Sequence, residues 1–240
     1  MAELTPLSRA RRPQPVADGV WIIDSDPIKV GGGMPLPIRM SVVRLAGGDL
    51  LLHSPAQYSD DLRGAIETLG TIRHLIAPSV EHWMFIPDWQ RACPAAKTWG
   101  VPGLRDRSQV RNAGVRIDAE LGNAAPDAWA SEIDQVLVRG VVFKEADFFH
   151  RASRTLLLTD LILNVEPQDL PPLSRVMASA LGILAPNGRA PIYVRALLKL
   201  NRAEASKAAA RLVAFDPERV VFAHGRWFER DGAAQRRGFP

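Results

Sequence analysis

The segment from residue 73 to residue 89, RHLIAPSVEHWMFIPDW, constrains the fold more than any other stretch of the chain. It begins with an apolar run, His74–Ala77, that is typical of a buried strand, and a short loop then presents Glu81 and His82. In many α/β proteins, ligands bind at the carboxyl ends of the strands. The acid–imidazole pair is therefore a candidate site, provided that other strands bring similar side chains to the same edge.

Three other apolar runs that we predict to be strands end in, or are followed by, side chains of the same chemical kind: His53, Asp160 and His224. Carboxylate oxygen and neutral imidazole nitrogen are ligands that suit zinc, iron or manganese. Each of these residues alone has an ordinary alternative role as a turn residue or a helix cap. Together they predict a metal site at a sheet edge where several strands end.

The first half of the chain predicts strands joined by short turns and helices. Ala46–Asp49 is a strong hairpin signal between two β-rich runs, and Ser59 can cap a helix that runs to about Leu69. Gly31–Gly33 lacks the ending of a phosphate-binding loop, so we expect a mobile loop from the first strand to Pro37. The predicted elements are strands at 20–23, 39–45, 50–53 and 74–77, and a short helix at 87–92.

The second half of the chain returns to strands after an irregular region at residues 94–122. The amphipathic, alanine-rich pattern near the end predicts one long helix before the last strand. The predicted elements are strands at 136–138, 141–143, 146–150, 155–159 and 219–223, and helices at 170–184 and 194–215.

The length of 240 residues and the hydrophobic content of 47% predict one globular domain. We expect a loose N-terminal arm over residues 1–18, a single domain over 19–228 and a basic tail over 229–240. The net charge of +4 is concentrated near the two ends, and no recognition motif accompanies it, so we expect no nucleic-acid partner. The lone Cys93 excludes an internal disulfide framework and a multi-cysteine zinc site.

Nothing near the start of the chain resembles a secretory signal, because no apolar run precedes Val20. The most apolar run, Leu156–Val165, is interrupted by Asp160 and is too short to span a bilayer. We therefore expect a soluble cytoplasmic protein without a membrane partner.

The order of these features resembles the metallo-β-lactamase fold superfamily. The phrases RMSVVRL, LLLHSP, HLIAPSVEHW, FFHRASRTLLLTDLI and FAHG are similar to a bacterial and plant branch of that superfamily with a degenerate metal motif. The resemblance covers residues 20–225. It implies an α/β (α+β) fold built as a four-layer αββα sandwich.

The resemblance also assigns positions in the superfamily's His-x-His-x-Asp-His loop. Ala77 and Ser79 stand where the first two histidines would be, Glu81 replaces the aspartate, and His82 is kept. Asp160 matches the bridging aspartate and His224 the final histidine. The resemblance thus implies that the first metal position is lost, and that Glu81, His82, Asp160 and His224 hold one divalent metal, with zinc first and iron or manganese as alternatives.

Three further residues, His150, Glu145 and His53, are not predicted to be ligands matching the family motif. His150 precedes a predicted strand that runs from 154 to 160, and six steps at roughly 3.3 Å separate the ends of that strand by about 20 Å. Ligands of one zinc lie at about 2 Å from it, so His150 is interpreted as a structural residue and Glu145 as a weak substitute for the missing third histidine. We expect His53 to support the ligands from a neighbouring position.

The leading functional hypothesis is a mononuclear metal-dependent hydrolase. Asp160 is its candidate catalytic residue, which would bridge or orient a water activated by the metal for attack on an ester, amide or phosphoester. The alternative is a non-catalytic descendant that binds a small ligand or partner, motivated by the loss of the first-site histidines. Redox chemistry at a non-haem iron is a third hypothesis. The identity of the small-molecule substrate is not encoded in any motif.

Overall fold

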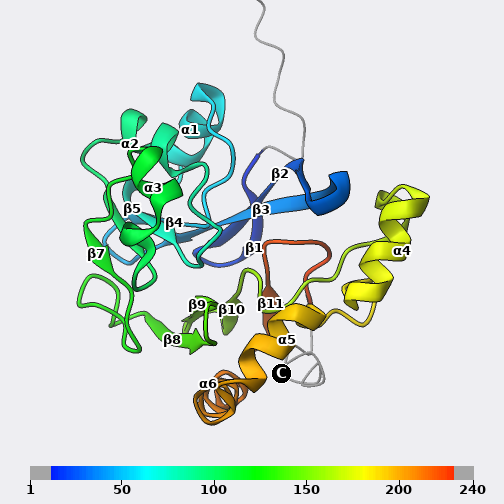
Figure 1. The fold of residues 1–240 in the computed structure, drawn as a ribbon. Coiled ribbons are helices and arrows are strands. Elements are labelled where there is room, and N and C mark those ends of the chain that lie inside the picture. The colour runs from blue at the N-terminus through cyan, green and yellow to red at the C-terminus, as the bar shows by residue number, and fades with distance from the viewer. Residues whose placement is uncertain (1–11, 230–240) are drawn as a thin grey trace, which may run out of the picture.

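A computed structural model describes residues 12–229 as two mixed β-sheets that face each other (Figure 1). The larger sheet has seven strands in sequential order: β1 (Gln14–Ala17), β2 (Val20–Val30), β3 (Met34–Arg44), β4 (Asp49–His53), β5 (Thr71–Ala77), β6 (Lys97–Gly100) and β7 (Ala119–Glu120). The four strands of the second sheet follow the order β11 (Arg219–Val221), β10 (Thr155–Leu157), β9 (Lys144–His150) and β8 (Ile133–Arg139).

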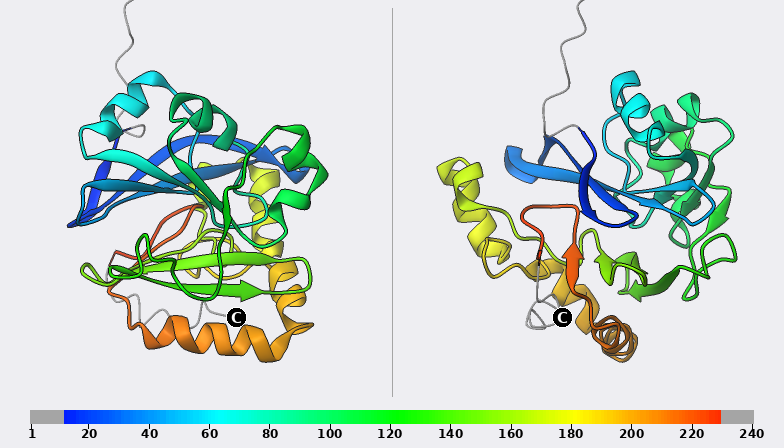
Figure 2. Two further views of the ribbon diagram at one scale, coloured as in Figure 1. Left: turned by 90° about the vertical axis from the view of Figure 1, so that its left-hand side faces the viewer. Right: turned by 180° about the vertical axis from the view of Figure 1, so that it is seen from behind.

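Helices cover the outer faces of both sheets, as the two views in Figure 2 show. The larger sheet is covered by α1 (Asp60–Glu67), α2 (Ile86–Ala92) and α3 (Ser108–Asn112), and the second sheet by α5 (Ile192–Lys199) and α6 (Arg202–Ala214). A further helix, α4 (Pro172–Leu181), stands beside the β2–β3 hairpin. The predicted four-layer αββα arrangement is confirmed.

Alternation of side chains along the strands separates the layers of the core. On β9, Ala146 and Phe148 pack in the cluster between the sheets, whereas Phe149 packs with residues of α5 and α6 on the outer face. This alternation is expected because successive side chains of a strand point to opposite faces. Apolar side chains thereby cover both faces of the second sheet.

Local signals in the first half of the chain fold as expected. Ser59 caps α1, because its hydroxyl oxygen accepts a hydrogen bond from the backbone N–H of Leu62 at 3.2 Å. The turn after Arg44 pairs β3 with β4, with Arg44 opposite Leu50. The helix α1 then returns the chain to β5, which lies parallel to β4. Consequently β4 and β5 end at the same edge of the sheet.

The predicted loop before Pro37 is wrong, because β2 and β3 form one long hairpin whose turn is Gly31–Gly33. Prolines in this stretch suggest irregular structure. However, the part of β3 before Ser41 pairs with β2 alone, so a missing backbone N–H on its other side removes no ladder bond. Residues 14–17 of the predicted loose arm form β1, an edge strand on β2.

Other boundaries differ in the second half. The expected strand at 141–143 is the turn between β8 and β9, where Val141 and Val142 are exposed. The irregular region contains β6, α3 and β7, and the long helix predicted at 194–215 is two helices that meet at Leu200–Asn201.

The predicted tail at 229–240 lies outside the described residues except for Glu229. Across residues 12–229, no helix combines the length and apolar character that a bilayer crossing requires.

Candidate metal centre

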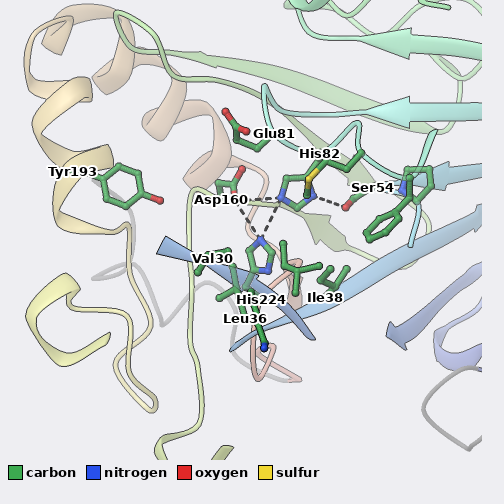
Figure 3. A pocket seen from close by; sticks show the side chains of 14 residues that line it. Val30, Leu36, Ile38, Ser54, Glu81, His82, Asp160, Tyr193 and His224 are labelled. Carbon is green, nitrogen blue, oxygen red and sulfur yellow. Dashed lines mark hydrogen bonds and ion pairs between the residues drawn. The ribbon is translucent and has the colours of Figure 1, made fainter. Parts of the chain in front are cut away.

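The side chains of His82, Asp160 and His224 converge at the edge between the two sheets (Figure 3). Nε2 of His82 lies 3.2 Å from Oδ1 of Asp160 and 3.2 Å from Nε2 of His224. The third side of this triangle, from Nε2 of His224 to Oδ1 of Asp160, measures 3.3 Å. Three ligand-type atoms from three distant parts of the chain are therefore almost equally spaced.

The loop that carries His82 is fixed to both sheets. It follows β5, and its Pro78 carbonyl accepts a hydrogen bond from the backbone N–H of Ala146 at 2.7 Å. Ser54, which follows β4 with a φ of 56°, places its hydroxyl oxygen 2.6 Å from Nδ1 of His82. If Nδ1 of His82 donates a hydrogen bond to the Ser54 oxygen, the ring is oriented so that Nε2 faces Asp160 and His224.

Asp160 is held from two sides, and neither contact uses Oδ1. The Ser79 hydroxyl donates a hydrogen bond to Oδ2 of Asp160 at 2.8 Å. The buried Glu145 carboxylate accepts hydrogen bonds from the backbone N–H groups of Thr159 and Asp160 at 2.6 and 2.7 Å. These contacts orient the Asp160 carboxylate so that Oδ1 faces the histidines.

His224 is oriented by the first sheet although it follows β11 of the second. Its Nδ1 lies 2.6 Å from the Pro37 carbonyl oxygen, which can only accept, so Nδ1 carries the proton and donates it. Arg39 donates hydrogen bonds to the Phe222 and Gly225 carbonyls at 3.2 and 2.6 Å and fixes the loop around His224. Nε2 of His224 is left to face Asp160 and His82.

Gly225 is required by close backbone contact in this loop. It has a φ of 91°, and a Cβ atom at this position would lie 2.2 Å from the Asn164 carbonyl oxygen. No other residue fits without a shift of the backbone. The His224-Gly225 pair after the last strand therefore combines a ligand-type side chain with the turn that places it.

Electrostatics in the cluster favour an ion pair when no metal is bound. Burial lowers the pKa of His82, but the Asp160 charge and hydrogen bond outweigh burial, with the Glu145 and Glu81 charges in support, and the net shift is upward. Burial raises the pKa of Asp160, but the charge on His82 and the hydrogen bonds with both histidines hold it well below its usual range. The triangle therefore accommodates positive charge beside an ionised carboxylate.

The donor set fits a divalent metal such as zinc. Ligand atoms at about 2.0–2.1 Å from a tetrahedral zinc are about 3.3–3.4 Å apart, close to the three separations that the structure contains. With its proton on Nδ1, a neutral His224 turns a lone pair on Nε2 toward the lone pairs of Asp160 Oδ1, and such atoms require a proton or a cation between them. Both imidazoles also have the hydrogen-bonded Nδ1 that is typical of metal-binding histidines.

The structure does not bring Glu81 into this set. Glu81 is 63% exposed, and its Oε1 accepts a hydrogen bond from Arg107 at 3.0 Å. It lines the same cavity as His82, yet its carboxylate is not one of the converging atoms. Among the described residues, the group with metal-binding geometry therefore has three members, His82, Asp160 and His224.

The remaining candidates occupy different positions. His53 is buried at the end of β4 with its ring against Phe148, and its Nε2 has no hydrogen-bond partner in the described part of the chain. Burial and, next, the charge of His82 lower the pKa of His53 to about 3. His150 lies at the opposite end of β9 from Glu145 and contacts Ser153, in agreement with the strand-length argument.

Sequence reasoning missed the residues that position the ligands. Ser79 was visible only as a replacement for a histidine, and Ser54 only as a residue after a strand. The Pro37 carbonyl has no side-chain signature at all. Glu145 was considered as a ligand, whereas its carboxylate binds backbone N–H groups.

A cavity of about 290 Å³ opens beside the three residues (Figure 3). Ile28, Val30, Leu36 and Ile38 of the β2–β3 hairpin form one wall, and Tyr193 of α5 also lines the cavity. Burial, and secondly the charges of Asp160, Glu81 and Glu145, raise the pKa of Tyr193 to about 12. Its phenol is therefore a neutral hydrogen-bond donor near pH 7.

Comparison with known proteins gives a family and a fold. A family model described as "Domain of unknown function (DUF4336)" matches residues 18–194. The sequence has no significant match among curated proteins.

Solved metallo-β-lactamases share the fold across almost the whole chain. The DIM-1 metallo-β-lactamase aligns with a TM-score of 0.64 at 13% identity, over 95% of this chain and 94% of that chain. The enzyme from Pontibacter korlensis aligns with a TM-score of 0.62 at 12% identity, over 94% and 98%. Rubredoxin oxygen:oxidoreductase from Desulfovibrio gigas aligns with a TM-score of 0.65 at 13% identity, over 95% of this chain and 60% of that protein.

Proposed function

We propose that this chain, which belongs to the DUF4336 family and has the metallo-β-lactamase fold, is a metal-dependent hydrolase with a single-ion site. The observation that carries the proposal is the triangle of His82 Nε2, Asp160 Oδ1 and His224 Nε2, with sides of 3.2 to 3.3 Å. These three residues would hold the ion. Zinc suits this donor set best, and iron or manganese are the alternatives.

A divalent ion held by these residues would supply Lewis acidity, which would acidify water and polarise a carbonyl or phosphoryl oxygen. The protein residues supply orientation. Ser54 and the Pro37 carbonyl hold the two imidazoles, and Ser79 holds the second carboxylate oxygen of Asp160. Three protein ligands leave a coordination position for water or substrate, as in catalytic rather than structural zinc sites.

The cavity supports an ester, amide or phosphoester as the substrate class. Its walls are largely apolar, Ser54, Glu81, His82, Asp160 and His224 provide polar groups, and Lys29 and Tyr193 also line it, which is the usual composition of a small-molecule site. The Tyr193 hydroxyl faces this cavity from α5 and can donate a hydrogen bond to a substrate oxygen. Hydrolysis in this cavity would place the apolar part of the substrate against the β2–β3 hairpin.

Metal content tests the proposal. Protein purified without chelators should contain about one zinc, iron or manganese per chain, and His82→Ala and His224→Ala should each lose it. Glu81→Gln is the matched control, because Glu81 lines the cavity but pairs with Arg107, and it should keep the metal. Retention of metal by both histidine variants, or loss of metal by Glu81→Gln alone, would contradict the assignment.

A non-catalytic binding protein is the second candidate, favoured by one observation. Ala77, Ser79 and Glu145 stand around the position of the lost first metal, and the last two make hydrogen bonds to Asp160 or its backbone instead. A screen of metal-loaded protein over simple esters, lactams and phosphodiesters distinguishes the two candidates. Stoichiometric metal without hydrolysis of any class would favour the binding protein.

A further inference from the structure

A second cavity of about 340 Å³ lies beside the one at the metal centre. It is a groove between the β2–β3 hairpin and α4, with walls formed mainly by aliphatic side chains: Val30, Met34, Leu36, Met177, Leu181 and Ile183. Among its lining residues, Tyr193 alone has a polar side chain. The groove therefore offers hydrophobic contact and almost no hydrogen bonds from side chains.

The two cavities adjoin each other at three residues. Val30, Leu36 and Tyr193 line both the groove and the cavity at the metal centre. In Figure 3, Val30 and Leu36 lie next to His224, and Tyr193 stands across the cavity from His82. An apolar chain that enters at His82 can therefore pass between the hairpin and Tyr193 into the groove.

The groove has a packed floor and a wall where the hairpin turn contacts α4. Met34, Leu36, Leu163 and Ile183 belong to a separate buried cluster beneath it, so its floor is a packed core. At the hairpin turn, a Cβ atom on Gly32 would lie 2.9 Å from Cε of Met177, which shows that the turn touches α4. The side chain of Met177 thus forms part of the wall where hairpin and helix meet, a place where methionine adapts well to flexible ligands.

From this arrangement we propose that the substrate is an ester with a linear acyl chain, whose alkyl part lies in the groove between the β2–β3 hairpin and α4. The proposal rests on the hydrolase proposed above. The bond between the acyl carbon and the leaving oxygen breaks, the oxygen of water bonds to the acyl carbon, and the leaving alcohol takes a proton. Aliphatic walls without hydrogen-bonding groups disfavour a sugar, a peptide or a nucleotide in the same place.

Hydrolysis of a chain-length series tests the acyl specificity. For zinc-loaded protein and 4-nitrophenyl esters from butanoate to decanoate, kcat/KM should rise by up to about fourfold per added methylene until the groove is filled. Met177→Trp places a larger side chain in the groove. It should lower kcat/KM for the decanoate ester at least about tenfold and leave kcat/KM for the butanoate ester unchanged. Val176→Trp on the exposed side of the same helix is the matched control and should keep the wild-type series.

Direct binding separates this inference from the proposed function. Decanoate titrated calorimetrically into metal-free protein, below its micelle concentration, should bind more tightly than hexanoate, and Met177→Trp should weaken only the longer acid. Leu181→Gln provides a second groove variant should the tryptophan disturb folding. Chain-length-dependent binding without ester hydrolysis would support the groove and overturn the hydrolase. Hydrolysis independent of chain length, with no decanoate binding, would overturn the groove.

Discussion

Glu145→Gln should weaken metal binding although Glu145 touches no ligand atom. The Glu145 carboxylate accepts a hydrogen bond from the backbone N–H of Thr159 at 2.6 Å and another from that of Asp160 at 2.7 Å. A glutamine has one acceptor oxygen, so its amide NH₂ group must face one of these N–H donors. Both the turn before Asp160 and the direction of its Oδ1 depend on the two bonds.

The expected magnitude follows from burial. Hydrogen bonds to a charged group contribute about 1.5–3 kcal/mol, and a buried N–H left unpaired costs about 1–3 kcal/mol, so we expect a loss of about 3 kcal/mol in the free energy of unfolding. For a chain of this size, such a loss lowers Tm by about 6–12 °C. Misplacement of a ligand by loss of its support typically costs about 10–100-fold in metal affinity.

Asp147→Asn is the matched control for this experiment. Asp147 lies two residues further along β9, is also fully buried, and makes no hydrogen bond to the turn that carries Asp160. Burial, and then the Glu145 charge, raise the pKa of Asp147 well above its usual range, so Asp147 carries the proton of this pair. Asparagine should therefore keep metal affinity and raise stability above about pH 4, because the unfolded state loses the Asp147 proton there while the folded state retains it.

The assays are zinc competition with a chromophoric chelator and urea unfolding at pH 7, on both variants and the unmodified protein. Glu145→Gln should lose affinity and Asp147→Asn should not. Equal affinity of all three proteins, or equal losses in the two variants, would refute the role assigned to the Glu145 hydrogen bonds.

Three further outcomes are expected. Burial lowers the pKa of His82, but the Asp160 charge and hydrogen bond together with the Glu145 and Glu81 charges outweigh burial and raise this pKa. Zinc affinity measured calorimetrically should therefore fall by up to about tenfold per pH unit below that pKa, and a constant affinity from pH 8 to 5 would contradict this. Burial lowers the pKa of His53 from 6.5 to about 3, so between these values the unfolded state binds a proton that the folded state does not bind. The free energy of unfolding measured in urea should therefore decrease as pH falls from 6.5 to about 3, by up to about 1.4 kcal/mol per pH unit. His53→Gln should reduce this pH dependence. Gly225→Ala should disorder the His224 loop and abolish metal binding, whereas Gly31→Ala, where a Cβ meets no atom within 4 Å, should leave zinc affinity unchanged.

Sequence patterns predicted the fold where an element begins or ends in a distinctive turn or cap. The β3–β4 hairpin and the capped α1 followed from Ala46–Asp49 and Ser59. The four-residue β6 was missed, because KTWG is too short to display a period. The β2–β3 hairpin was missed for a different reason: Gly31–Gly33 indicated a mobile loop, whereas these glycines form the turn between two long paired strands. Strand order is a property of the whole chain.

At the candidate site, the sequence placed three of the four predicted ligands. His82, Asp160 and His224 were named because strand ends in a sheet edge lie close together, and the structure brings these three side chains within contact of one another. Glu81 is next to His82 in sequence but turns toward Arg107. Side-chain direction in a loop depends on its tertiary partners, and no local pattern specifies that Ser79, not Glu81, contacts Asp160.

The replacement of the first-site histidines also explains why one ion is expected here instead of two. An aspartate that bridges two metals with one oxygen on each needs both oxygens free. In this chain Oδ2 of Asp160 accepts the Ser79 hydroxyl, from the position where the family resemblance places a histidine. Glu145, on the strand that pairs with Ser79, binds the backbone of Asp160. Ser79 and Glu145 therefore hold Asp160 toward the proposed single ion, and Ser79→His alone would remove a support of Asp160 before it created a second site.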